Sequence, residues 1–296
     1  MQIPVRLLPA VLLALLSALG GCSSEASAEA GPIRFSAIPD QNSTELKEKF
    51  DIVANYLSEQ LGVPFEYVPS VDYGASVEAF KNGDIHLAWF GGLSGVRART
   101  TVPGASAIAQ GTIDPEFKSY FIANASLGLQ LSDSFPSQLE GKSFTFGSHG
   151  STSGRLMPEH FLRVETGKKP ADFFGREPNY SGAHDKTAQL VESGAYQAGA
   201  LSYTAYERLV AEQKIDPSKC VKIWETPTYP DYNWTAHPDL DRLHGAGFTQ
   251  RIQTAIVAMQ EPSLLKAAQR EAGFIKASNE DFAPLETLAR DLELLR

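Results

Sequence analysis

The sequence predicts an α/β protein with two similar lobes and a ligand cleft between them. From residue 33 onward, apolar segments with the periodicity of strands and of helices alternate, which favours mostly parallel sheets covered by helices. Residues 79–90 (AFKNGDIHLAWF) and 189–201 (QLVESGAYQAGAL) share one design, in which a helix ends at a glycine and a buried strand follows. The roughly 275 residues left after the leader also exceed most single cores. Open α/β sheets bind ligands beyond the carboxyl ends of their strands, so the cleft is the expected site.

The first half contains three expected strands, at residues 33–38, 65–68 and 85–90. Apolar residues at helical spacing from Leu46 to Leu61 predict a helix between the first two strands. Residues 42–44 offer N-caps for this helix, and Gly62 ends it. A second helix is expected at residues 75–81.

The second half repeats this order. Its expected elements are strands at residues 144–146 and 198–202 and helices at residues 158–166 and 187–192. Pro158 either begins its helix or removes one hydrogen bond near the helix start. The tail is amphipathic at residues 249–259 and 284–295, and its leucines are expected to pack on the first lobe.

Two extended segments rich in aromatic residues, 118–124 and 221–235, are the expected crossings between the lobes. The predicted domain boundaries are residues 32–123 plus 226–296 for lobe 1 and residues 124–225 for lobe 2.

The N-terminus has the features of a secretory signal, predicted to span residues 1–21. Arg6 precedes a run of apolar or small residues from Leu7 to Leu19, which is too short to span a membrane. The residues before Cys22 resemble a bacterial lipobox, which predicts cleavage and lipidation there and a membrane-anchored lipoprotein of the periplasm or cell surface. Secretion without an anchor is the alternative. Residues 22–31 are small and polar, as a tether should be.

The mature chain is acidic. Residues 1–21 contain only one charged residue, Arg6, so 25 Lys and Arg face 35 Asp and Glu, a net charge of −10. Nucleic acid is an unsuitable partner, because binding to a phosphate backbone needs a basic surface. Once Cys22 is modified, Cys220 is the single remaining cysteine, so no internal disulfide and no thiolate metal cluster are expected. Metal-ligand spacings and dinucleotide motifs do not occur, and no cofactor is expected.

A loop of small hydroxyl residues is the strongest candidate site. The β-prone run Lys142–Phe146 stops at Gly147, and Ser151, Thr152 and Ser153 follow between glycines before a predicted helix. The first amides of a helix have no partner within it, and the helix dipole leaves about half a positive charge there. Such a loop favours an anion. Capping of the helix by one of these hydroxyls is the alternative.

Further candidates lie on other loops that face the predicted cleft. They are Tyr73, Phe90, Gly91 and Gly92 from the first lobe, His184 from the second lobe, and Asp231 from the returning crossing. Each has a structural alternative: Tyr73 would staple its helix, and His184 would begin one. Trp89, at the end of a buried strand, is more readily a core residue.

Four segments carry a family resemblance: IRFSAIP, VDYGASVEAFKNGDIHLAWFGG, GSTSGRLMP and SGAHDKTAQLVESG. Together they resemble the periplasmic substrate-binding proteins of ABC transporters for phosphonate, phosphite and related tetrahedral oxyanions, over about residues 32–280. The segments IPDQNSTEL and LAWFGGLSGV are most similar to a subgroup labelled as selenate-transport binding proteins. The resemblance implies the two-lobe, type II periplasmic binding protein fold and an ABC permease in the inner membrane as partner. A monomer is expected.

The resemblance also implies roles for individual residues. In that family a Ser-Thr-Ser loop at a helix start holds the oxygens of the anion, which implies this role for Ser151–Ser153. A tyrosine of the first lobe matches Tyr73, the histidine before the second helix matches His184, and an acidic residue of the returning crossing corresponds to Asp231.

The identity of the oxyanion stays open. The family commonly shows Gly-Pro and then Tyr after the strand, whereas this chain has Gly91-Gly92 and Gly95, which suggests a different ligand substituent. An ionised Asp231 would repel a dianion and favour an anion that keeps a proton to donate. Phosphonate and phosphite can keep a proton near neutral pH, but selenate and sulfate cannot. A protonated His184 would have the opposite effect.

Three functions are compatible with these residues to different degrees. Capture of a small oxyanion for import is favoured, and the protein is not expected to be an enzyme. A serine hydrolase is disfavoured because GSTSG has Thr152 at the centre of a would-be G-x-S-x-G elbow, and because His184 and Asp185 are sequence neighbours. A ligand sensor that presents the same anion to a signalling receptor would use the same site.

Overall fold

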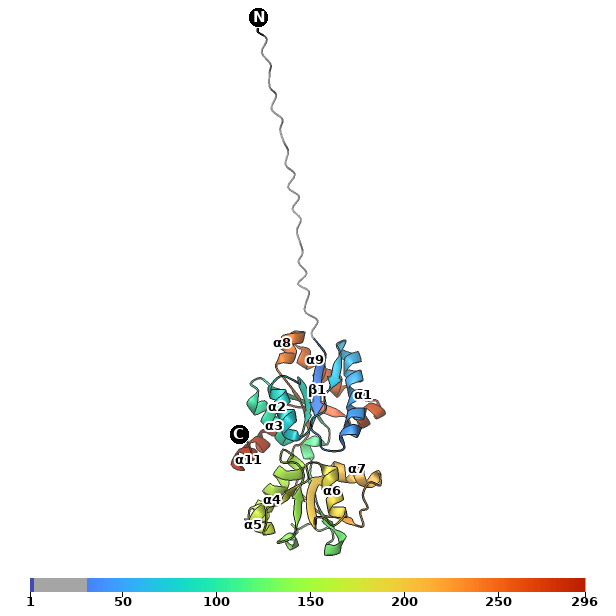
Figure 1. Ribbon diagram of the computed structural model, residues 1–296, viewed down its shortest axis with the longest axis vertical. Coiled ribbons are helices and arrows are strands. Elements are labelled where there is room, and N and C mark those ends of the chain that lie inside the picture. Colours follow the sequence, from blue (N-terminus) through green and yellow to red (C-terminus); the bar gives the residue numbers. More distant parts are fainter. Residues whose placement is uncertain (3–30, 296) are drawn as a thin grey trace. The chain divides into compact units, whose positions relative to one another are not determined.

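The computed structural model describes residues 1–2 and 31–295, and the strands of the second range form two separate sheets (Figure 1). The predicted signal peptide, the tether and Cys22 therefore lie outside the described residues, apart from the first two residues and Gly31. Within the described residues, each helix is too short or too polar to cross a membrane.

The first sheet has six strands in the order β11-β4-β10-β3-β1-β2. These strands are β1 (Ile33–Ala37), β2 (Phe65–Tyr67), β3 (Leu87–Phe90), β4 (Ser106–Gly111), β10 (Asn233–Ala236) and β11 (Phe274–Lys276). One face is covered by α1 (Ser43–Leu61), α9 (Phe248–Val257) and α10 (Pro262–Ala267). The other face is covered by α2 (Tyr73–Lys81), α3 (Gly92–Thr101) and α11 (Ala283–Asp291), and α8 (Asp239–His244) contacts α9.

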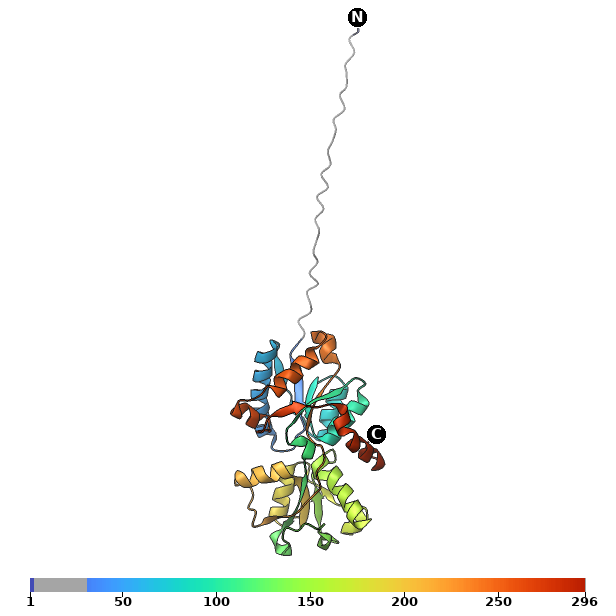
Figure 2. The same cartoon turned by 180° about the vertical axis from the view of Figure 1, so that it is seen from behind.

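The second sheet has five strands in the order β7-β6-β8-β5-β9. These strands are β5 (Ser119–Asn124), β6 (Phe144–Phe146), β7 (Asn179–Tyr180), β8 (Ala198–Ser202) and β9 (Cys220–Glu225). Helices α4 (Met157–Thr166) and α5 (Pro170–Phe174) lie on one side of it, and α6 (His184–Glu192) and α7 (Tyr203–Ala211) lie on the other (Figures 1 and 2).

The predicted α/β class, with two sheets flanked by helices, is confirmed. The strand pairing is mixed rather than mostly parallel, because five of the nine strand pairs in the described residues are antiparallel. Two antiparallel strands lie inside their sheets and follow the crossings between the sheets. Strand β10 follows the return from the second sheet and pairs with β3 and β4, and β5 enters the second sheet between β8 and β9. Strand β11 adds an antiparallel edge to β4.

The chain crosses between the two sheets at a pair of backbone hydrogen bonds. Phe117 and Tyr229 exchange N–H···O bonds of 2.9 Å in both directions. Strand β5 includes residues 119–123, which the predicted boundary assigns to the first lobe, so this pairing favours crossings near residues 117 and 229.

Helix α3 was not predicted. Its sequence, GLSGVRARTT, contains two glycines and three hydroxyl residues, which are weak helix formers. The helix exists because Leu93, Val96 and Ala98 are buried against the first sheet, where tertiary packing outweighs low propensity.

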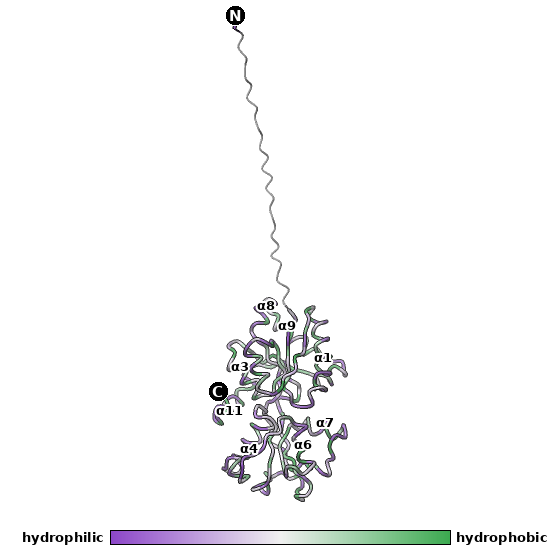
Figure 3. Tube along the Cα trace, in the orientation of Figure 1, coloured by the Kyte–Doolittle hydropathy of each residue, from purple (hydrophilic) through white to green (hydrophobic). Residues whose placement is uncertain are grey.

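The hydrophobic cores follow the two sheets. Alternation along β5 sends Phe121 to the side of α4 and α5 and Tyr120 and Ile122 to the side of α6 and α7. Hydrophilic residues lie mostly along the outer helices and loops of both halves (Figure 3). In the tail, Leu285 is buried in the core of the first sheet, as expected.

Candidate functional site

The Ser-Thr-Ser loop (Ser151–Ser153) opens a wide helical turn. Residues Thr152–Leu156 form one π-turn before α4, in which the Leu156 amide donates to the Ser151 carbonyl at 3.1 Å. Such turns are rare in proteins as a whole, and those that occur are often found at functional sites. The Ser151 hydroxyl oxygen accepts from the Gly154 amide at 2.9 Å, so capping, the alternative reading of this residue, is present. Pro158 is the second residue of α4, where its missing N–H costs little.

Two amides of this turn are available to a ligand. The backbone N–H groups of Thr152 and Ser153 make no hydrogen bond with any described residue, and both side chains are 1% exposed. Unpaired amides at a helix start carry the positive end of the helix dipole. The turn can therefore accommodate negative charge.

The start of α3, from the first sheet, meets this loop. The Leu93 amide donates to the Thr152 hydroxyl at 2.9 Å, and the Ser94 hydroxyl donates to the Gly150 carbonyl at 3.0 Å. A Cβ atom at Gly150 would lie 2.8 Å from the Cβ of Tyr73 on α2. The two halves are thus closed on each other around the loop.

Gly91 and Gly92 lie beside the loop. A Cβ atom at either glycine would come within 3.4 Å of the Thr152 hydroxyl oxygen, and one at Gly92 would meet Leu285 of α11 at 2.4 Å. The Gly92 amide does not face an open site, because it donates to Oδ1 of Asp231 at 2.8 Å.

Asp231 is the buried carboxyl group of the site. It is 1% exposed, and its Oδ2 atom has no hydrogen-bond partner among the described residues. Burial raises the pKa of Asp231 to about 7, although the Gly92 amide and the hydroxyls of Thr152 and Ser153 act to lower it. A carboxyl group with such a pKa can carry or share a proton near neutral pH.

Tyr73 contributes a second polar atom without a partner. Its side chain is 2% exposed, and its hydroxyl makes no hydrogen bond with the described residues. Burial raises the pKa of this phenol, and the carboxylates of Asp40 and Asp231 add to the shift, so the hydroxyl keeps its proton as a donor.

His184 begins α6 and is held in one orientation. Its amide donates to the Asp40 carbonyl at 2.9 Å, and its Nδ1 accepts from the Ser202 amide at 3.4 Å. Burial lowers the pKa of His184, so the ring is neutral at pH 7 and carries its proton on Nε2. Nε2 lies 3.5 Å from the Tyr232 hydroxyl, which donates to Oδ2 of Asp40 at 2.8 Å.

Phe90 differs from the other candidates. Its ring is fully buried and packs edge-to-face on Phe80, with ring centroids 5.7 Å apart. Its backbone lies next to Gly91 of the site, but its ring is part of the hydrophobic core.

Several groups around the site were missed by sequence reasoning. Asp40 could have been found, because it follows the carboxyl end of β1, where open sheets place ligand groups. The amide of Leu93 and the hydroxyl of Ser94 were missed because α3 was not recognised. Ser119, whose hydroxyl donates to the Ser153 carbonyl at 2.7 Å, had no distinguishing signal.

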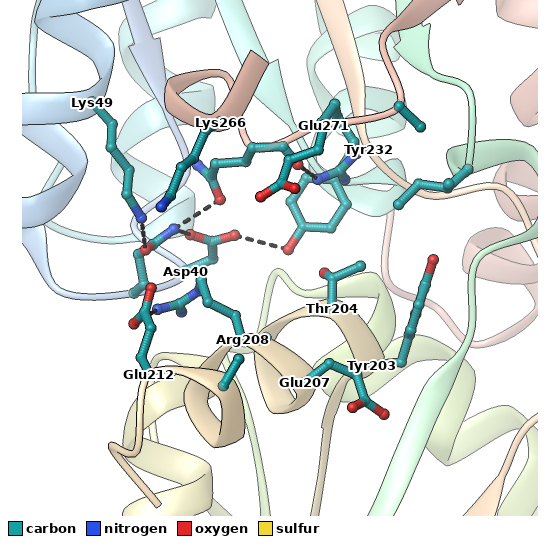
Figure 4. A pocket seen from close by; sticks show the side chains of 17 residues that line it. Asp40, Lys49, Tyr203, Thr204, Glu207, Arg208, Glu212, Tyr232, Lys266 and Glu271 are labelled. Carbon is teal, nitrogen blue, oxygen red and sulfur yellow. Dashed lines mark hydrogen bonds and ion pairs between the residues drawn. The ribbon is translucent and has the colours of Figure 1, made fainter. Parts of the chain in front are cut away.

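A cavity of about 670 Å³ lies beside this site, between α7 and the α1 and α10 region of the first half (Figure 4). Asp40 and Tyr232 line it, while Ser151–Ser153 do not. Its walls carry both lysines and glutamates, including Lys49, Lys266 and Glu271. Asp40 and Tyr232 therefore contact both this mixed-charge cavity and His184 of the site.

Comparison with known proteins gives a consistent result. Residues 35–282 match the family model described as ABC transporter, phosphonate, periplasmic substrate-binding protein. The chain is 38% identical over 270 residues to the probable ABC transporter phosphite binding protein PhnD1 of Prochlorococcus marinus (strain MIT 9301), covering 89% of this chain and 91% of that protein. It is 28% identical over 207 residues to the phosphate-import protein PhnD of Mycolicibacterium smegmatis, covering 66% and 62% of the two chains.

Solved structures agree with the sequence comparisons. The structure of PhnD1 from Prochlorococcus marinus in complex with methylphosphonate superposes with a TM-score of 0.84 at 39% identity, covering 89% of this chain and 98% of that one. A binding protein component of an ABC phosphonate transporter from Pseudomonas aeruginosa has a TM-score of 0.76 at 18% identity, covering 89% and 87%, and shares the fold. The type II periplasmic binding protein fold is therefore confirmed.

Asp231 makes folding stability depend on pH in a defined direction. Its pKa is about 7 in the folded protein and about 3.9 in an unfolded chain. Its contribution to stability is therefore fully present below about pH 4 and is lost as the pH rises through about 7. Between about pH 5 and pH 8, we expect the unfolding free energy of Asp231→Asn to rise by roughly 1–3 kcal/mol relative to that of the wild type.

Urea denaturation at the two pH values measures this difference. The exposed Asp84→Asn variant is the control, and its stability should follow the wild type at both pH values. Parallel wild-type and Asp231→Asn profiles would show that burial does not perturb Asp231.

Proposed function

This chain belongs to the family of periplasmic substrate-binding proteins of ABC phosphonate transporters, and we propose that it captures a small tetrahedral oxyanion and delivers it to an ABC permease in the inner membrane. The relatives that define the family are transport proteins, and no catalytic activity is proposed. Delivery to a signalling receptor is the alternative, since sensing would use the same site.

One observation carries the proposal. The Tyr73 hydroxyl and Oδ2 of Asp231 are buried without a partner among the described residues, next to the two unpaired amides of the Ser-Thr-Ser loop. Leaving buried polar groups unpaired costs about 1–3 kcal/mol each, so a structure that gathers several of them at one point favours a polar ligand there. The donors are amides, hydroxyls and a neutral imidazole, which suit an anion of low charge.

The same groups favour an anion that still carries a proton. Above about pH 7, where Asp231 is ionised, its Oδ2 accepts a hydrogen bond from a protonated oxyanion, whereas the carboxylate repels a fully deprotonated dianion. His184 is neutral and does not offset this repulsion with a positive charge. We therefore favour phosphite or a small phosphonate over selenate. The names of the relatives, which refer to phosphite, methylphosphonate and phosphate, support this choice.

Enclosure supports tight binding without a paired cation. Ser151, Thr152, Ser153, His184 and Asp231 are each 2% exposed or less, so the bound anion would be shielded from water. Hydrogen bonds from fixed donors are stronger in such a low-dielectric site than in water. An acidic protein can hold an anion in this way.

Replacement of Tyr73 by phenylalanine separates ligand binding from folding. The apo stability of Tyr73→Phe should stay within about 1 kcal/mol of wild type, because the lost hydroxyl makes no hydrogen bond within the described residues. The affinity for phosphite should fall about tenfold or more, since a hydrogen bond to a charged group contributes about 1.5–3 kcal/mol. Calorimetric titration and thermal denaturation measure the two effects.

Tyr206→Phe is the matched control. The Tyr206 hydroxyl donates to the Cys220 carbonyl at 2.7 Å, so this variant should lose stability and keep affinity. Unchanged phosphite affinity in Tyr73→Phe would remove Tyr73 from the ligand site.

A panel of anions tests the proposed selectivity. A ligand at 100 times its Kd adds about 2.7 kcal/mol of stability. At pH 8, where Asp231 is mostly ionised, phosphite and methylphosphonate should bind more tightly than selenate and sulfate and should therefore raise the melting temperature of the wild type more. Asp231→Asn should narrow this difference, because it removes the negative charge that repels the dianions. Selenate binding tighter than phosphite binding in the wild type would contradict the proposed ligand class.

Anchoring through Cys22 is a further part of the proposed function, supported by the lipobox-like residues before it. Wild-type protein expressed in bacteria should incorporate labelled palmitate and sediment with membranes, and Cys22→Ser should be unlabelled. Unlabelled, soluble wild-type protein would show that the mature chain is not a lipoprotein.

A further inference from the structure

A buried ion pair lies where the chain crosses between the two halves. The guanidinium of Arg270 donates to both carboxylate oxygens of Asp114, from Nε and Nη2, each at 2.7 Å. The two side chains are 3% and 0% exposed, while every other ion pair among the described residues has at least one partner exposed by 14% or more. Asp114 lies three residues before Phe117, at the outgoing crossing.

The backbone turn after α10 directs the Arg270 side chain towards the interior of the protein. Gln269 has a φ of 63°, in the left-handed region that non-glycine residues seldom adopt. The Gln269 carbonyl accepts from Nη1 of Arg270 at 2.6 Å, and its side-chain oxygen accepts from Gln41 at 2.8 Å. Unfavourable backbone geometry of this kind persists where the surroundings enforce it, often at functional sites.

The two residues of the ion pair contact the Asp231–Tyr232 dipeptide, Asp114 through its main-chain carbonyl and Arg270 through its guanidinium. The Asp114 carbonyl accepts from the Asp231 amide at 3.0 Å. The Arg270 guanidinium lies 4.5 Å from the centre of the Tyr232 ring and 4.9 Å from that of Trp89, and these two rings stack with centroids 5.5 Å apart. One member of the pair therefore holds the backbone of Asp231, and the other holds the ring of Tyr232.

Resting on the oxyanion-binding function proposed above, we infer that the Asp114–Arg270 pair positions Asp231 and Tyr232 at the ligand site and thereby sets affinity and anion selectivity. Both positioning residues act through others and do not contact the ligand. Asp231 presents its free Oδ2, and the Tyr232 hydroxyl connects Asp40 with His184.

Folding stability alone is a weak reason for such a pair. The free-energy cost of removing two charges from water offsets much of the free energy gained from their attraction. Replacement of a whole buried pair by uncharged groups is therefore often neutral or stabilising. Removing one partner is different, because it leaves an unpaired buried charge. A double replacement can therefore separate positioning from stability.

The test is the double variant Asp114→Asn with Arg270→Met. Asparagine keeps an acceptor for the Gly111 amide, which donates to Asp114 at 2.8 Å, and methionine keeps apolar contact with the rings. We expect the apo melting temperature to stay within about 5 °C of wild type. The Kd for phosphite should rise about tenfold or more, and the preference for phosphite over sulfate should fall.

Arg270→Lys is the second variant, and it decides the matter if the double variant does not fold. It keeps a cation opposite Asp114 but loses the flat face and the two-pronged hydrogen bond, so affinity and selectivity should fall in the same direction. Arg251→Met is the control, because Arg251 also stacks on a ring, Phe248 at 5.2 Å, and donates to the Leu61 carbonyl at 3.0 Å away from the site. It should leave the Kd unchanged.

The outcomes separate the two levels of inference. Wild-type protein that binds none of the tested oxyanions would refute the proposed function itself. Wild-type affinity and selectivity in a folded double variant, or in Arg270→Lys, would refute the positioning role alone. An equal loss of affinity for phosphite and sulfate in both variants would also count against it, because positioning of Asp231 should change selectivity.

Discussion

The removal of polar groups from water is the constraint on which the rest of this structure depends. A carboxyl group, a phenol and an imidazole are gathered at one point between two sheets, and Asp231, Tyr73 and His184 are each 2% exposed or less. Burial shifts all three pKa values towards the uncharged form. Such a site has few charges of its own. Its hydrogen bonds are expected to be strongest with a ligand that is charged and can share a proton.

Two helix starts meet at this point and have different roles. The amides of Gly92 and Leu93, at the start of α3, are already occupied by Asp231 and Thr152. The amides of Thr152 and Ser153, at the start of the π-turn, make no hydrogen bond with the described residues. The first helix start thus joins the two halves, and the proposed function assigns the second to the anion. Because Thr152 takes part in both, the proposal implies that closure and binding are coupled through this residue.

Much of this arrangement could be predicted, with a clear limit. Strands β1, β2, β3, β6 and β8 and the hydroxyl loop follow from periodicity and turn residues, which are local signals, whereas β4, β7 and β11 were not predicted. Helix α3 escaped prediction because packing creates it against weak propensity, and the insertion of β5 and β10 into the middle of their sheets depends on pairing between distant segments. Phe90 was predicted as a ligand contact from its position, but strand alternation turns its ring into the core.

By itself, the sequence determined the α/β class, the family motifs and the Ser-Thr-Ser loop at a helix start, because each is encoded within a few neighbouring residues. Only the tertiary structure decided which groups face that loop. Gly92 and Asp231, joined by a hydrogen bond, are 139 residues apart, and Leu93 and Thr152 are 59 apart. The burial that raises the pKa of Asp231 to about 7 arises from the same long-range contacts. No local pattern encodes them, since burial is a property of the assembled fold.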